Sequence, residues 1–129
     1  MDIQTNIDSA SQLTTFTLRG ELDFNKLLDH VKDMHALSEH TSSCLYDLRS
    51  IAGGESVSVL QIGRFYELCG LYFYGEPIHK IAFVVNGQID FGLAQVMKTF
   101  EELHDVYLNI RTFKDLDIAL QWLFEHPVS

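Results

Sequence analysis

The apolar run Ile-Ala-Phe-Val-Val at residues 81–85 is the feature that most limits the fold of this chain. Five apolar residues in a row, followed by Asn86-Gly87, are typical of a strand that is covered on both faces, as in a parallel sheet. Helix-length amphipathic segments stand before and after it, at residues 56–74 and 89–103. Strands that alternate with helices of this length are joined by right-handed crossovers. The sequence therefore predicts an α/β protein with a largely parallel sheet.

The remaining elements follow from the same patterns. Alternating apolar residues predict a hairpin at the start of the chain, with DSASQ as its turn. Apolar residues at helical spacing predict helices after Gly20 and after Lys114, and Asp23 stands as the cap of the first. In chain order, the predicted strands and helices are 2–7, 13–18, 23–40, 44–48, 56–74, 81–85, 89–103, 106–110 and 115–125. We expect one domain over residues 1–129, with a mostly parallel five-stranded sheet and four helices in the order ββαβαβαβα.

The charge of the chain argues against several classes of partner. Eighteen acidic residues against nine Lys and Arg give a formal net charge of −9. Such a surface repels nucleic-acid backbones and anionic membranes, so we expect neither partner. The N-terminus has no secretion signal, and the apolar stretch at 65–74 is shorter than the roughly 20 residues of a membrane-spanning helix. Cys44 and Cys69 lie in apolar segments without metal-ligand spacing. These features predict a cytoplasmic protein with buried thiols.

A strand end, a glycine pair and a helix start follow one another at residues 46–60, YDLRSIAGGESVSVL. A serine that follows flexible glycines is accessible, and its hydroxyl can accept a hydrogen bond from the first helical turn. A phosphate there would place about −2 charge at the positive end of the helix dipole. The residues of this candidate phospho-switch or docking loop are Asp47, Gly53, Gly54, Glu55 and Ser56. The plainer interpretation, that Ser56 only caps the helix, stays open.

The segment FYELCGLYFYG carries more aromatic residues than one sheet face can bury. They are Phe65, Tyr66, Tyr72, Phe73 and Tyr74. Surplus apolar surface of this kind favours a dimer interface or a pocket for an apolar ligand. A buried helix end whose tyrosine hydroxyls reach solvent is the equally open alternative.

The sequence gives little support for an enzymatic site or a metal site. Gly54-Glu55-Ser56 begins like the nucleophile elbow Gly-x-Ser-x-Gly, but Ser58 occupies the place of the second glycine. The glycine pair also lacks the Gly-Lys-Ser/Thr ending of a phosphate-binding loop. The histidines at 30, 35 and 40 each lie about 140° further around a helix, so they do not converge on one metal ion. We expect no catalytic residues, no metal and no cofactor.

Four segments carry a resemblance to the STAS domain, the fold of bacterial anti-sigma-factor antagonists, and more closely to the small SpoIIAA-like proteins of the STAS/SEC14-type group. These are TTFTLRGELDFNKLLDHV, CLYDLRSIAGGE, KIAFVVN and FKDLDIALQWLFE. In the antagonists, a phosphorylatable serine follows the strand-end Asp by nine residues, which in this chain is Ser56 after Asp47. Glu55 replaces the Asp that precedes that serine, and Val57 and Ser58 replace a small residue and a glycine.

The resemblance implies a non-enzymatic interaction module. We expect it to bind a protein partner over residues 53–58 and the following helix, with a second copy of the chain as one candidate partner. Because the resemblance extends to lipid-binding SEC14-type domains, the alternative is a small carrier that binds an apolar molecule or lipid beside residues 65–74.

Overall fold

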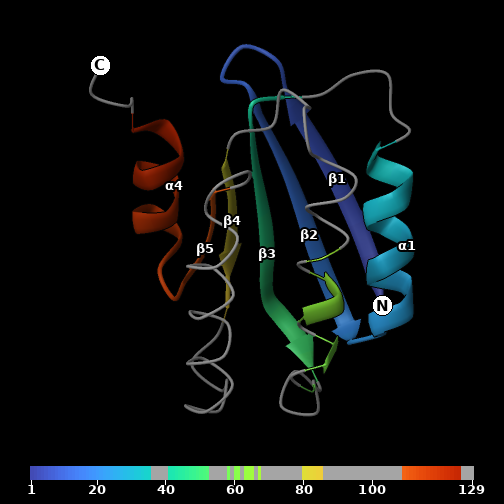
Figure 1. Ribbon diagram of the computed structural model, residues 1–129. Helices are drawn as coiled ribbons and strands as arrows, with labels where there is room; N and C mark the ends of the chain where they lie inside the picture. The colour runs from blue at the N-terminus through green and yellow to red at the C-terminus, as the bar shows by residue number, and fades with distance from the viewer. Residues whose placement is uncertain are drawn as a thin grey trace.

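The structure is a computed structural model of the chain, and it describes residues 1–35, 41–52, 58, 60–61, 63–65, 67, 80–85 and 109–125. These residues form a five-stranded mixed sheet with helices on both faces (Figure 1). The elements are β1 (Asp2–Asp8), β2 (Leu13–Glu21), α1 (Phe24–His35), β3 (Ser43–Ala52), β4 (Lys80–Val84), β5 (Asn109–Phe113) and α4 (Leu116–Phe124). Residues 60, 61, 63–65 and 67 are also helical.

The strands lie in the order β1-β2-β3-β4-β5. β1 and β2 pair antiparallel, which confirms the predicted hairpin, and the other three neighbouring pairs are parallel. The Asp8 carboxylate accepts the backbone N–H groups of Ala10 and Ser11 at 3.1 and 3.3 Å, which closes the hairpin turn. Because β2 to β5 run in the same direction, their carboxyl ends meet at one edge of the sheet. We call this the carboxyl edge.

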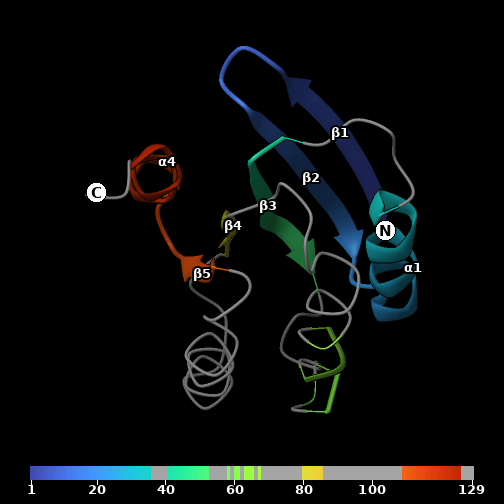
Figure 2. The same ribbon diagram turned by 45° about the horizontal axis from the view of Figure 1, so that its top comes forward.

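One face of the sheet is aliphatic and is covered by α4. Leu45, Ala82 and Val84 pack there against Ala119 and Leu123 of the helix. Figure 2 shows α4 lying over the β4 and β5 end of the sheet. The residues of β4 from 81 onward are fully buried, as the unbroken apolar run predicts for a strand covered on both faces.

The opposite face carries an aromatic row, which we define as Phe16, Tyr46 and Phe83. The strand register places these three rings side by side across β2, β3 and β4. Their centroids are 4.9 and 5.0 Å apart. His30 of α1 lies 4.5 Å from Phe16 at one end of the row, and Phe65 lies 5.4 Å from Phe83 at the other. The row thus joins α1 to the helical residues around position 65.

The predicted strand at 106–110 ends three residues too early, because β5, described as Asn109–Phe113, continues to Phe113. The prediction followed the apolar residues 106–108, which lie outside the described residues. The observed strand includes Arg111 and Thr112. β5 is the last strand in the sheet order, and a strand at that place has one neighbour and tolerates polar side chains.

Other predicted boundaries also need correction. β2 and β3 extend to Glu21 and Ala52, because their ladder continues through polar residues beyond the predicted ends. The helix predicted to begin at Ser56 begins later, since Ser58 is not helical. The helix at 89–103 and the segments 36–40 and 68–74 lie outside the described residues, so the total of four helices stays a prediction. Within the described part of the chain, no helix has the length and apolar character required to cross a bilayer.

Candidate functional site

β3 changes character at Asp47, near the carboxyl edge. The residues from Ser43 to Tyr46 are buried, whereas Asp47 is half-buried and Arg49 is exposed. One extra residue lies in β3 opposite β2 between the pairs Thr17↔Asp47 and Arg19↔Ser50. Such a bulge interrupts the ladder and redirects side chains, and bulges are common beside functional sites. The strand end that leads into residues 53–57 is therefore locally irregular.

Asp47 and Arg49 form a two-pronged ion pair. The carboxylate accepts hydrogen bonds from Arg49 Nε at 2.9 Å and Nη2 at 2.8 Å, and from the Arg49 backbone N–H at 3.1 Å. The hydrogen bonds from the guanidinium are the main reason that the pKa of Asp47 lies below its usual value. Asp47 is consequently ionised and engaged at neutral pH. An ionised, paired carboxylate of this kind is suited to holding the Arg49 side chain beside the bulge of β3 and is poorly suited to proton transfer.

Two charged residues on neighbouring elements act on this ion pair. Arg19 of β2 helps to lower the pKa of Asp47, and Asp115 helps to raise that of Arg49. Asp115 is itself the N-cap of α4, where its Oδ1 accepts the N–H groups of Asp117 and Ile118 at 2.8 and 3.3 Å. We call Arg19, Asp47, Arg49 and Asp115 the edge cluster. It links the ends of β2 and β3 to the start of α4.

A capping box stands on the other side of the segment 53–57. Ser58 Oγ accepts the Gln61 N–H at 3.2 Å, and the Ser58 N–H donates to Gln61 Oε1 at 2.9 Å. This reciprocal pair is the Ser-x-x-Gln form of a helix start. The sequence contains that signal at residues 58–61, but the sequence analysis placed the cap at Ser56. Ser58, which is exposed, is therefore a site residue that sequence reasoning missed.

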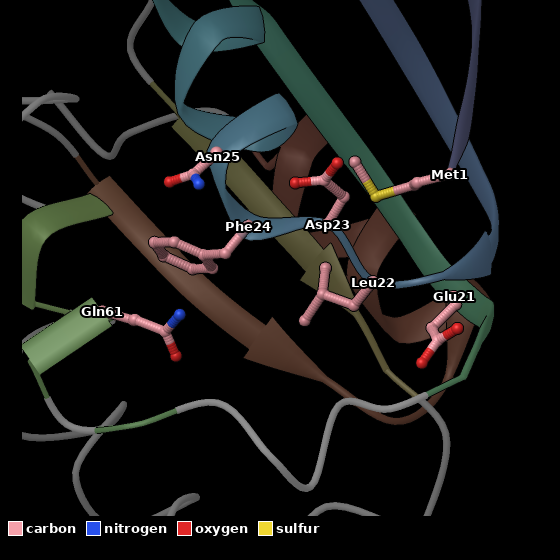
Figure 3. Close-up of a pocket in the computed structure, with 7 residues that line it drawn as sticks. All are labelled: Met1, Glu21, Leu22, Asp23, Phe24, Asn25 and Gln61. Atoms are coloured by element: carbon pink, nitrogen blue, oxygen red, sulfur yellow. The ribbon is translucent and has the colours of Figure 1, made fainter.

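An open hollow of about 460 Å³ adjoins the capping box where β2 passes into α1. Its lining residues are Met1, Glu21, Leu22, Asp23, Phe24, Asn25 and Gln61. Figure 3 shows the Phe24 ring and the Gln61 amide facing the same space. Glu21 and Asp23 make the rim acidic, and Asp23 also caps α1 by accepting the Lys26 N–H at 3.2 Å. Leu60, beside Gln61 in sequence, is 85% exposed.

The predicted site residues are only partly within the described chain. Asp47 is at the carboxyl edge, whereas Gly53, Gly54, Glu55 and Ser56 lie outside the described residues. Of the aromatic segment, Phe65 is buried, and its ring centroid lies 5.4 Å from that of Phe83. The other members, Tyr66, Tyr72, Phe73 and Tyr74, lie outside the described residues. The proposed dimer or ligand surface on this segment stays a prediction.

The part of the chain that the structure describes contains no site suited to metal binding or thiol chemistry. No group of three or more His, Cys, Asp or Glu side chains gathers there in a way that could hold a metal ion. Cys44 is buried, and this burial raises the pKa of its thiol to about 12. Its reactive thiolate form is consequently suppressed at neutral pH. Cys69, His40 and the side chain of His35 lie outside the description.

Neither a known family profile nor a curated protein matches this chain. Among solved structures, it is similar to the crystal structure of an uncharacterized protein of the DUF3478 family from Shewanella loihica PV-4, which is described as having a SpoIIAA-like fold. The TM-score is 0.53 at 20% sequence identity, over 95% of this chain and 92% of that chain. A likeness at this identity concerns the fold. The chain therefore has a SpoIIAA-like α/β fold, which confirms the resemblance seen in the sequence.

Proposed function

We propose that the protein is a non-enzymatic regulatory module of STAS type, which binds a protein partner over residues 53–58 and the helix that follows. One observation carries the proposal: well-defined contacts stand in the chain on both sides of residues 53–57, the Asp47–Arg49 ion pair in β3 before them and the Ser58–Gln61 capping box after them. A partner that binds here meets neighbouring residues that are already fixed by hydrogen bonds, which lowers the entropic cost of binding. The fold, which is that of a SpoIIAA-like protein, is consistent with this role.

The chemistry beside the segment suggests what the partner presents. Leu60 exposes most of its side chain, and Leu22 and Phe24 add apolar surface in the hollow. Glu21 and Asp23 supply negative charge next to it. A partner segment with one apolar anchor flanked by Lys or Arg would complement both properties.

A pull-down from native cell lysate with wild-type protein and Leu60→Asp tests the proposal. We expect the variant to lose the partner, because a charge at the centre of an apolar contact leaves it unpaired on binding. Ile118→Asp on α4 is the matched control, since Ile118 is also exposed but lies away from the capping box. Retention of the partner by both variants would reject the proposed surface.

Ser56→Glu examines the segment itself. It places negative charge one residue after Glu55 and two residues before the Ser58 cap. If the partner contacts the segment, its affinity changes in this variant, whereas Ser9→Glu in the hairpin turn leaves it unchanged. A partner that ignores Ser56→Glu does not bind over the segment.

The alternative, a carrier of an apolar ligand beside residues 65–74, stays a prediction. Phe65 is the aromatic residue of that segment that the structure describes, and it packs against Phe83 inside the protein. Native mass spectrometry of protein purified from its source cells would reveal a retained lipid, and a bare protein mass would argue against the carrier.

A further inference from the structure

The imidazole of His30 lies in an unusual place for a titratable group. It makes edge-to-face contacts with two rings of the aromatic row, Phe16 at 4.5 Å and Tyr46 at 5.7 Å. Its Nε2 atom is buried and has no hydrogen-bond partner among the residues that the structure describes. An unsatisfied buried polar atom in a native fold calls for an explanation. The proposed docking surface does not involve His30, so its role must be sought elsewhere.

Protonation changes what this imidazole requires. The neutral ring carries one N–H group, whereas the charged ring carries two donors and a full positive charge. The second N–H group of the charged imidazole would point at aromatic ring atoms, although it needs an oxygen atom as its acceptor. The attraction of a cation to aromatic faces offsets part of this cost, but the ring also loses its hydration. Burial is accordingly the main cause of a lowered pKa for His30.

The charged and titratable groups around His30 do not reverse this balance. Asp33, one turn further along α1, attracts the charged ring and partly raises the pKa. Lys26, one turn earlier, directs its Nζ to the Met1 carbonyl at 2.6 Å. β3 brings the Tyr46 phenol and the Cys44 thiol to this face. β1 and β2 place only uncharged residues on it, namely Ile3, Thr5, Ile7, Thr14, Phe16 and Leu18.

We propose that His30 is an acid-sensitive latch that holds α1 on the aromatic row when neutral and loosens it when protonated. Leu27, one turn before His30, is the buried apolar side chain among those that the structure describes on this helix. The latch is independent of the proposed docking function. It also has a physical route to the helix that Ser58 caps, because the row continues from Tyr46 through Phe83 to Phe65.

The sign of the pH dependence follows from the direction of the pKa shift. The folded protein binds a proton at His30 less readily than the unfolded chain, whose histidine pKa is near the ordinary value of 6.5. The unfolded state therefore holds more protons below pH 6.5, and the folded state loses stability as the pH falls. The folding equilibrium falls by up to about tenfold per pH unit while only the unfolded state takes up the proton.

The direct test is an NMR titration of the histidine rings in the wild-type protein between about pH 8 and pH 5. We expect His30 to titrate below the ordinary value, with parallel shifts in the Phe16 and Tyr46 ring signals. Hydrogen exchange, corrected for its intrinsic pH dependence, should show weaker protection of α1 but not of α4 at the acidic end. An ordinary His30 titration, or equal loss of protection in both helices, would overturn the proposal.

Two variants sharpen the test. His30→Phe removes the titration and should abolish the acid loss of α1 protection, while Asp33→Asn should lower the His30 pKa further. If His30→Phe does not fold, the wild-type titration and Asp33→Asn still decide the outcome. An unchanged acid response in both variants would assign it to another group.

Discussion

α1 and α4 lie on opposite faces of the same sheet, and different chemistry holds each of them (Figure 2). α4 rests on aliphatic side chains and is capped at both ends, by Asp115 at its start and by Lys80 at its end. Among the side chains of α1 that the structure describes, Leu27 is buried and the His30 imidazole lies among aromatic rings of the other face. Burial of aliphatic groups does not depend on pH, whereas an imidazole contact does. The packing of α4 on the sheet should therefore not change with pH, whereas the contact of α1 through His30 should weaken in acid.

The largest expected effect comes from emptying the aliphatic face. Leu123→Ala removes a buried side chain between α4 and the sheet and should lower the free energy of unfolding by about 2–5 kcal/mol. Urea unfolding followed by circular dichroism measures this loss. Ile118→Ala, on the exposed side of the same helix, should stay within about 0.5 kcal/mol of wild type. Similar losses in the two variants would mean that α4 does not pack as described.

The cap at the start of α4 should have the next largest effect. Asp115→Ala leaves the N–H groups of Asp117 and Ile118 without their acceptor and should cost about 1 kcal/mol in the free energy of unfolding. Asp117→Ala is the matched control, because it removes a first-turn charge but no cap and should cost about 0.3 kcal/mol. If Asp117→Ala lost as much free energy of unfolding as Asp115→Ala, the effect would come from the lost charge and not from the lost cap.

The end of α4 offers a smaller test. Lys80 Nζ donates to the carbonyl oxygens of Trp122 and Glu125 at 2.7 and 2.8 Å. It also lies 5.1 Å from the Trp122 ring centroid. Lys80→Met keeps the apolar stem but loses the charge, so we expect a loss of about 0.5 kcal/mol and a shifted Trp122 emission. Lys32→Met on α1 should leave that emission unchanged.

The smallest effect concerns the edge cluster, and it separates two pH windows. The pKa of Asp47 is lowered, so its contribution is complete above the ordinary value of 3.8 and is lost as the pH falls below it. Because the Arg49 side chain is exposed, Asp47→Asn should cost less than about 0.5 kcal/mol at pH 7. Thermal unfolding across the acidic range should show this loss below 3.8, and that of His30 already below 6.5. If stability fell in one pH range only, and not separately for His30 and for Asp47, the distinction between the two faces would be contradicted.

Much of the fold was predictable because its signals are local. The unbroken apolar run of β4, the alternation and turn of the opening hairpin, and the Asp115 cap of α4 all appear in consecutive residues. The strand that carries Asp47 was also found in this way, but its extension to Ala52, the ion pair of Asp47 with Arg49 and the bulge beside it were not. The Ser58 cap was within reach of sequence reasoning, since Ser-x-x-Gln is a helix-start pattern.

The position of β5 was not predictable by the same means. Its register follows from pairing with β4, from Lys80↔Asn109 to Val84↔Phe113, and its neighbours in sequence do not reveal it. A strand at the end of the sheet order accepts polar residues, so the apolar pattern did not reveal that β5 continues through Arg111 and Thr112 to Phe113.

For the described residues, the sequence by itself determined where the strands and helices lie, apart from some of their ends, and that they build an α/β sheet, because caps, turns and periodic burial depend on near neighbours. Only the tertiary structure decided that His30 meets Phe16 and Tyr46, and that the hollow opens beside the Ser58 cap. Those contacts join residues far apart in the chain. They depend on strand register and helix placement, which are set by the packing of the whole core.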